Sequence, residues 1–142
     1  MRVVINIDDS IRDPRVVAMA ARGLLLQLIA INRVLIRQAE KAGKPFPSLI
    51  TSDVRWKAEP WKGKVEEFAD IKRIFERGWG DCDDFIGAYC AQRIERALKQ
   101  GRRERWTPKV YWRKQPHGGY LYHAQIRCPD GRVIDPSRLL GM

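Results

Sequence analysis

The decisive stretch of this chain is GWGDCDDFIGAYCAQ (residues 78–92), in which a cysteine stands among acidic residues where an apolar helical pattern begins. Asp81 is a good N-cap residue for a helix that starts at Cys82. Free amide groups at a helix N-terminus stabilise an anion, which lowers the pKa of a thiol. Nearby carboxylates oppose this, but successive helical side chains point about 100° apart, so capping acids need not face the sulfur. Cys82 is therefore a candidate nucleophile, and a small residue packed beside a helix cap is the plainer alternative.

The spacing of apolar residues predicts three helices. Asp13 and Pro14 begin the first, which continues to Ala42 and stops at Gly43. The second spans 64–77, and the third spans 82–99. The first is expected to be a central buried helix, with a role in a subunit interface as the alternative. A short strand is predicted over residues 2–7, RVVINI, and residues 44–63 are expected to be irregular, with one short extended piece.

The hydrophobic period changes to two in the last third of the chain. Strands are predicted over 109–114, 120–128 and 132–139. Gly118-Gly119 and the PDG of 129–131 are the turns, so the last two strands should form a hairpin. Helices followed by a small antiparallel sheet define an α+β class. The 142 residues are expected to form a single domain, with its N-terminal helical part over about residues 1–63.

The net charge of +10 favours acidic partners. Part of the excess is local, because seven basic residues and one acid lie between Lys99 and Lys114. A solvated helix end and loop is the plain explanation. Nucleic-acid binding, with Trp106 and Trp112 as stacking surfaces, is a less favoured alternative because no base-reading motif is present.

The three cysteines predict neither a disulfide framework nor a metal centre. Their number is odd, and no pair of Cys82, Cys90 and Cys128 has metal-ligand spacing. Cys90 and Cys128 are expected in the core, and no cofactor is indicated. The N-terminal residues lack the pattern of a signal peptide, and Arg22, Gln27, Asn32 and Arg33 interrupt the most apolar stretch. A cytoplasmic protein without membrane insertion is therefore expected by default.

A base and an acid follow the cysteine in the chain. On the predicted strand 120–128, His123 shares a face with Gln125, opposite the apolar set that includes Ala124 and Ile126. Asp135 lies on the adjacent strand and can accept a hydrogen bond from the imidazole. A nucleophile, a base and an orienting acid in these elements match the logic of covalent catalysis. A structural histidine is the ordinary alternative.

Two segments, GWGDCDDFIGAYCAQRIERAL and YHAQIRCPDGRVIDPS, resemble the transglutaminase-like superfamily of the papain-like fold. The resemblance covers about residues 64–138. It implies that Cys82 is the nucleophile, that His123 is the general base and acid, and that Asp135 orients the imidazole. It also implies that the backbone amide of Cys82 is one oxyanion donor. Candidates for the second donor or for the cleft, by position alone, are Trp56, Trp61, Trp79 and Gln125.

The chemistry that this resemblance implies is attack of a thiol on an amide carbonyl to give a thioester. Water resolves the thioester in a hydrolase and an amine resolves it in an acyltransferase, and the small size of the chain favours hydrolysis of a peptide or protein substrate. The alternative is a catalytically silent structural or interaction protein of the same fold. Such a protein would bind an acidic partner or a phage-type assembly, and would then be virion-associated.

Overall fold

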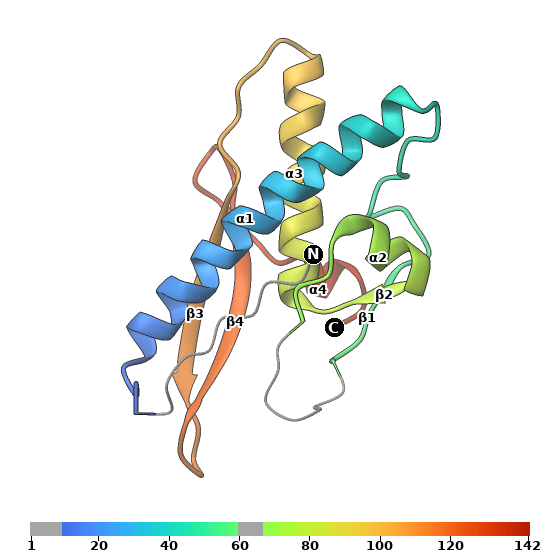
Figure 1. Ribbon diagram of the computed structural model, residues 1–142. Helices are drawn as coiled ribbons and strands as arrows, with labels where there is room; N and C mark the ends of the chain where they lie inside the picture. The colour runs from blue at the N-terminus through green and yellow to red at the C-terminus, as the bar shows by residue number, and fades with distance from the viewer. Residues whose placement is uncertain (1–9, 60–66) are drawn as a thin grey trace.

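The chain combines four helices with a small antiparallel sheet in the computed structural model, which describes residues 10–59 and 67–142 (Figure 1). This arrangement confirms the α+β class. Trp61 and the predicted strand 2–7 lie outside the described residues. The elements are α1 (Pro14–Lys41), β1 (Arg55–Trp56), α2 (Ile71–Arg77), β2 (Trp79–Gly80), α3 (Cys82–Lys99), β3 (Thr107–Lys114), β4 (Tyr120–Arg127), β5 (Val133–Ile134) and α4 (Pro136–Leu139).

Helix α1 matches its predicted bounds. Asp13 caps it by accepting a hydrogen bond from the backbone N–H of Arg15 (2.9 Å), and Pro14 occupies the first turn. Figure 1 shows α1 crossing α3 and the β3–β4 hairpin, and it packs on both. Only one face is buried, whereas Met19 on the other face is 70% exposed. The expected central buried helix is therefore buried along one face only. By length and composition alone, α1 is also apolar enough to cross a membrane.

Helix α2 is shorter at its start than predicted. It begins at Ile71, after Asp70, whose side chain accepts a hydrogen bond from Arg73 N (2.9 Å). The backbone N–H of Ala69 donates to Asp84 Oδ1 (2.6 Å), and that of Ile71 donates to Asn32 Oδ1 (2.8 Å). Side chains of other helices thus take up the amides of Ala69 and Ile71, which explains why the predicted helix does not extend through residues 67–70; residues 64–66 of that prediction lie outside the described residues.

The antiparallel sheet has the strand order β3-β4-β5. In its register Tyr111 lies opposite His123, and Ile126 lies opposite Ile134. The predicted hairpin of the last two strands is confirmed. The last strand ends at Ile134, however, because Asp135 and Pro136 begin the short helix α4.

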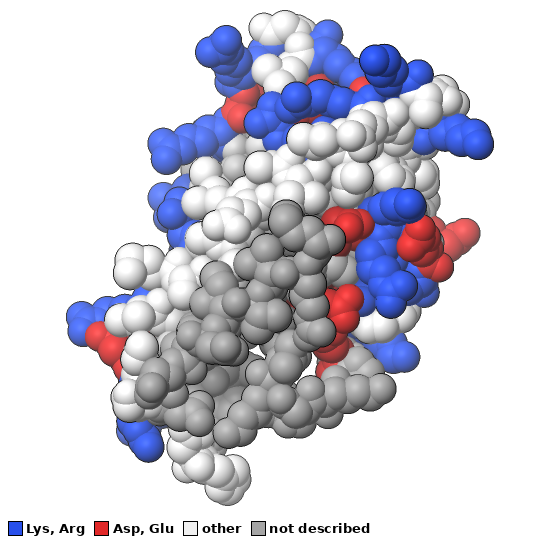
Figure 2. Space-filling view, in the orientation of Figure 1, with Lys and Arg blue, Asp and Glu red and all other residues white. Residues whose placement is uncertain are grey.

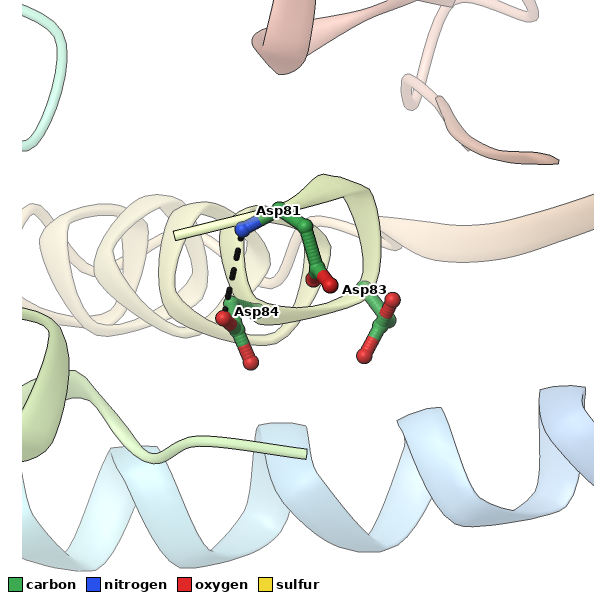
Figure 3. A group of neighbouring side chains, drawn as sticks. All are labelled: Asp81, Asp83 and Asp84. Carbon is green, nitrogen blue, oxygen red and sulfur yellow. Dashed lines mark hydrogen bonds between the residues drawn. The ribbon is translucent and has the colours of Figure 1, made fainter. Parts of the chain in front are cut away.

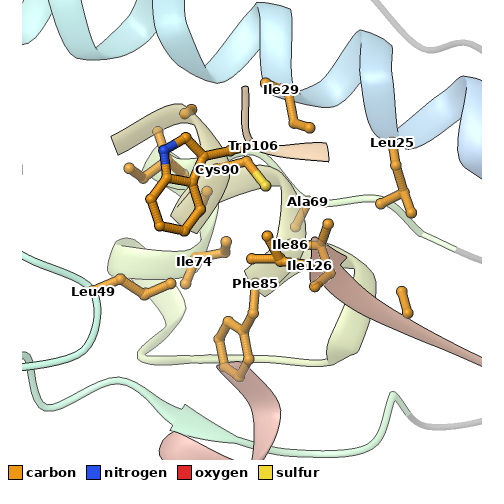
Figure 4. Packing of buried hydrophobic residues seen from close by; sticks show 14 of the residues in the cluster. Leu25, Ile29, Leu49, Ala69, Ile74, Phe85, Ile86, Cys90, Trp106 and Ile126 are labelled. Carbon is orange, nitrogen blue, oxygen red and sulfur yellow. The ribbon is translucent and has the colours of Figure 1, made fainter. Parts of the chain in front are cut away.

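The core surrounds α3. Figure 4 shows Phe85, Ile86 and Cys90 of α3 directed among side chains of α1, α2 and β4. Cys90 and Cys128 are both buried, as predicted. The buried carboxylate of Glu95 also joins α3 to α1, since it accepts hydrogen bonds from Arg33 Nε (2.6 Å) and from the Arg37 guanidinium. Burial alone would raise the pKa of Glu95, but these two arginines hold it below its usual value.

Helices α1 and α3 pack closely against each other at Gly87. A Cβ at this position would lie 2.5 Å from Cδ2 and 2.7 Å from Cγ of the buried Leu28. No such contact is tolerable between carbon atoms, so the close packing of the two helices requires glycine here.

We expect Gly87→Ala to lower the free energy of unfolding by about 1–3 kcal/mol, because the added methyl group overpacks the α1–α3 contact. Gly23→Ala in α1 is the matched control, since a Cβ there meets nothing within 4 Å. This control should raise the free energy of unfolding by about 0.5–1 kcal/mol through helix propensity. Urea unfolding monitored by circular dichroism measures both values. Equal effects of the two substitutions would contradict the packing argument.

Candidate active site

Cys82 is the first residue of α3 and is half-buried. Its Sγ lies 3.7 Å from Oδ1 of Asp83, and the backbone amide of Ala124 in β4 faces the sulfur. The start of α3 and the middle of β4 therefore meet at the thiol. Because Ala124 follows His123, the structure brings the predicted nucleophile and the predicted base to adjoining segments.

His123 and Asp135 form a direct pair. Nε2 of the imidazole lies 2.7 Å from Oδ2 of Asp135, and the two side chains are 18% and 7% exposed. The other carboxylate oxygen, Oδ1, accepts a hydrogen bond from the backbone N–H of Ser137 (3.1 Å) and so caps α4. A neutral imidazole that donates from Nε2 to a carboxylate keeps its lone pair on Nδ1. This pair leaves Nδ1 as the atom that can accept a proton.

Tyr111 is a site residue that the sequence analysis missed. It lies opposite His123 in the β3–β4 register, and the two rings meet edge to face with centroids 5.4 Å apart. Partial burial and the charge of Asp135 raise the pKa of Tyr111, and a charge on Cys82 adds to the rise. The phenol is thus in electrostatic reach of both groups. The strand pattern around the Gly118-Gly119 turn was the available signal, because it places Tyr111 opposite His123.

The thiol of Cys82 is electrostatically disfavoured as an anion. Burial raises its pKa most, the charges of Asp83 and Asp81 raise it further, and the Ala124 amide only partly offsets them. The pKa therefore lies well above its ordinary range, so the expected lowering by the helix N-terminus is wrong. The first physical reason is burial, which disfavours the thiolate, and the second is that the Asp83 carboxylate contacts the sulfur instead of pointing away from it. Among the described residues, no hydrogen bond joins Sγ to His123.

Three buried acids surround the start of α3. Carboxylate oxygens of Asp81, Asp83 and Asp84 lie within 4.8 Å of one another, close enough to hold a cation (Figure 3). Asp84, however, already accepts hydrogen bonds from the backbone N–H groups of Ala69 (2.6 Å) and Asp81 (3.2 Å) and from the Arg77 guanidinium. Burial and the charge of Asp81 raise the pKa of Asp84. Since protein donors take up its oxygens, we assign the cluster to the helix start and not to a metal.

The candidates for oxyanion donors and for the cleft differ in how freely they can reach a substrate. The backbone N–H of Cys82 has no acceptor in the described part of the chain and could donate to a substrate oxygen. Trp79 is half-buried, with the Arg77 guanidinium 3.7 Å and the Lys57 ammonium 5.3 Å from its ring. Trp56 packs against the core, and its backbone N–H donates to the Leu140 carbonyl (2.8 Å).

Gln125 remains the cleft candidate with the most direct placement. It is half-buried and lies two residues after His123 on β4, hence on the same face of the sheet. A second oxyanion donor from Gln125, Trp56 or Trp79 stays a prediction.

Comparison with models of protein families, with curated proteins and with solved structures finds no match. The resemblance to the transglutaminase-like superfamily therefore also stays a prediction.

The raised pKa of Cys82 predicts slow alkylation at neutral pH. The iodoacetamide reaction of Cys82, followed by mass spectrometry of its peptide, should reach its midpoint above the value of about 8.5 for free cysteine. Asp83→Asn should lower this midpoint, because it removes a charge that opposes the thiolate. Asp130→Asn is the control, since this exposed acid pairs with Arg132 at a distant turn. A wild-type midpoint below that of free cysteine would instead indicate a preformed thiolate–imidazolium pair.

Proposed function

We propose that this chain is a cysteine-dependent hydrolase or acyltransferase of the transglutaminase-like, papain-like type, acting on amide bonds of a peptide or protein. One observation carries the proposal. His123 donates from Nε2 to Asp135 at 2.7 Å, and the next backbone amide, that of Ala124, faces the Cys82 sulfur. An oriented base beside a thiol at a helix start is the arrangement that nucleophilic catalysis requires.

The reaction begins from a neutral thiol, because the pKa of Cys82 is raised. As Sγ bonds to the amide carbonyl, Nδ1 of His123 accepts the thiol proton. Asp135 stabilises the resulting imidazolium through the Nε2 hydrogen bond. The backbone N–H of Cys82 donates to the oxyanion of the tetrahedral intermediate.

The intermediate then collapses to a thioester. The C–N bond breaks, and the imidazolium returns its proton to the leaving amine. In hydrolysis, His123 next takes a proton from a water molecule that attacks the thioester, which releases a carboxylic acid and restores the thiol. An amine in place of water gives transamidation. Because Cys82 and His123 do not form a thiolate–imidazolium pair before the attack, His123 must accept the thiol proton during the attack itself.

A catalytically silent structural or interaction protein of the same fold is the second candidate. It is favoured by the raised pKa of Cys82 and by the exposed apolar face of α1, where Met19 and Val34 are 70% and 49% exposed. Figure 2 shows an uncharged band along this helix. In this case α1 would bind a partner in a phage-type assembly, and the protein would be virion-associated instead of cytoplasmic.

Acyl transfer from p-nitrophenyl acetate separates the two candidates. We expect wild-type protein to release p-nitrophenol and to carry one acetyl group on Cys82, located by peptide mass spectrometry. His123→Ala should slow acetylation by about a hundredfold or more, because the general base is lost. Asp135→Asn should also slow it, although asparagine can still cap α4.

His117→Ala is the matched control, since this second histidine lies exposed in the β3–β4 turn. It should acetylate at the wild-type rate. The silent protein would be favoured if Cys82 is not acetylated at all. It would also be favoured if His123→Ala and His117→Ala slow the acetylation of Cys82 equally.

A further inference from the structure

The β3–β4 hairpin has one covered face and one open face. Pro108, Ala124 and Ile126 are buried on the side that packs against α1 and α3. The register places the alternate residues of the two strands together on the other side. This open face consists of Thr107, Lys109, Tyr111 and Arg113 on β3 and of Leu121, His123, Gln125 and Arg127 on β4.

The open face carries positive charge without acidic partners. Lys109, Arg113 and Arg127 are exposed, and none of them forms an ion pair with any described residue. Two other basic residues do have acidic partners, since Arg132 pairs with Asp130 (2.6 Å) and Arg102 with Glu104. Three cations without an ion-pair partner among the described residues therefore lie on the face that also carries His123.

A groove of about 470 Å³ extends this charge at one end of the sheet. Arg22 of α1, Arg105, Lys109 and Arg127 line it together with Pro108 and other uncharged residues, and no carboxylate of residues 10–59 or 67–142 lines it. Arg22 is held on the wall by a hydrogen bond from its Nε to the Pro108 carbonyl (3.3 Å). Four cations around a partly enclosed space attract an anion more strongly than the same charges dispersed in water.

We propose that this groove binds carboxylate side chains of an extended acidic segment of the substrate, an inference that rests on the proposed function. Arg127 and His123 are four residues apart on the same face of β4, which is about 13 Å at roughly 3.3 Å per residue. An extended peptide covers this distance in about four residues. The reacting amide at His123 and an Asp or Glu about four positions away would thus be bound together.

Nucleic acid is the less suitable occupant. Single-stranded nucleic acid is commonly held by aromatic side chains that stack on its bases, and none of the described aromatic residues lines the groove. Trp106, one of the two stacking residues in the less favoured nucleic-acid alternative, is buried. Its Nε1 donates to Glu104 (2.8 Å), and the Arg93 guanidinium covers its ring at 4.7 Å. That expectation is therefore wrong for Trp106.

Binding is tested in Cys82→Ala protein, which cannot turn over a substrate. A fluorescein-labelled peptide of alternating Glu and Gly should raise its anisotropy on binding, whereas the Gln counterpart should not. The pair Lys109→Glu and Arg127→Glu should weaken binding at least about tenfold. The pair Lys72→Glu and Arg132→Glu makes the same change in net charge at basic residues that already have partners, and should weaken it much less.

Three results would overturn the groove as an acidic-peptide site. These are no binding of the Glu peptide, equal weakening by both charge-reversed pairs, or groove-dependent binding of a thymidine oligonucleotide in place of the peptide. The first excludes the ligand, the second indicates a non-local charge effect, and the third assigns the groove to nucleic acid.

The link to the proposed active site has a separate test in wild-type protein. Chloroacetamide peptides with glutamates several glycines away, on either side of the chloroacetyl group, should alkylate Cys82 faster than their Gln counterparts. The Lys109→Glu and Arg127→Glu pair should abolish this advantage but should leave acetylation by p-nitrophenyl acetate intact. Peptide binding without acetylation would contradict the proposed function alone, whereas acetylation without a glutamate advantage would contradict this inference alone.

Discussion

The buried carboxylate of Asp84 holds together the segments that meet at the start of α3. It accepts hydrogen bonds from the backbone of residues 69 and 81 and pairs with Arg77 at the end of α2. A buried acid of this kind is stable only when donors surround it. The segment that contains residue 69, the end of α2 and the start of α3 must therefore pack together around Asp84. Gly80 fits the same junction, because a Cβ there would lie 2.7 Å from the Phe85 ring. The position of Cys82 follows from this packing.

The same junction determines the electrostatics of the thiol. Acids that organise the helix start also oppose ionisation of the neighbouring sulfur. Stability of the fold and reactivity of the cysteine therefore compete at one helix turn. In the proposed mechanism His123 resolves this competition by accepting the proton during attack. The resting protein then does not need Cys82 to be a thiolate.

Much of the fold could be predicted from local pattern. Helices α1 and α3 follow from their apolar periodicity and caps, and β3 and β4 from alternation and turn residues. The start of α2 could not be predicted from local pattern, because the amides of Ala69 and Ile71 bind side chains from α3 and α1 that are distant in the sequence. The end of β5 could have been predicted, since Asp135-Pro136 is itself a helix-start signal.

The site was only partly predictable for the same reason. Order along the chain identified Cys82, His123 and Asp135, and the structure pairs the last two directly. The burial of Cys82 and the side-chain direction of Asp83 both depend on tertiary packing, and together they reverse the expected shift in the pKa of Cys82. Tyr111 becomes visible only when the two strands are placed in register.

The double use of Asp135 has a consequence for synthesis of the protein. One of its oxygens caps α4 while the other orients His123, and the Leu140 carbonyl beyond it is bound by the backbone of Trp56. A ribosome releases Cys82 and His123 before it releases these residues. The emerging chain thus exposes a thiol whose imidazole is not yet oriented, and the site is completed only when the last helix docks. Under the proposed function, the nascent protein therefore lacks the oriented base for acyl transfer until α4 has docked.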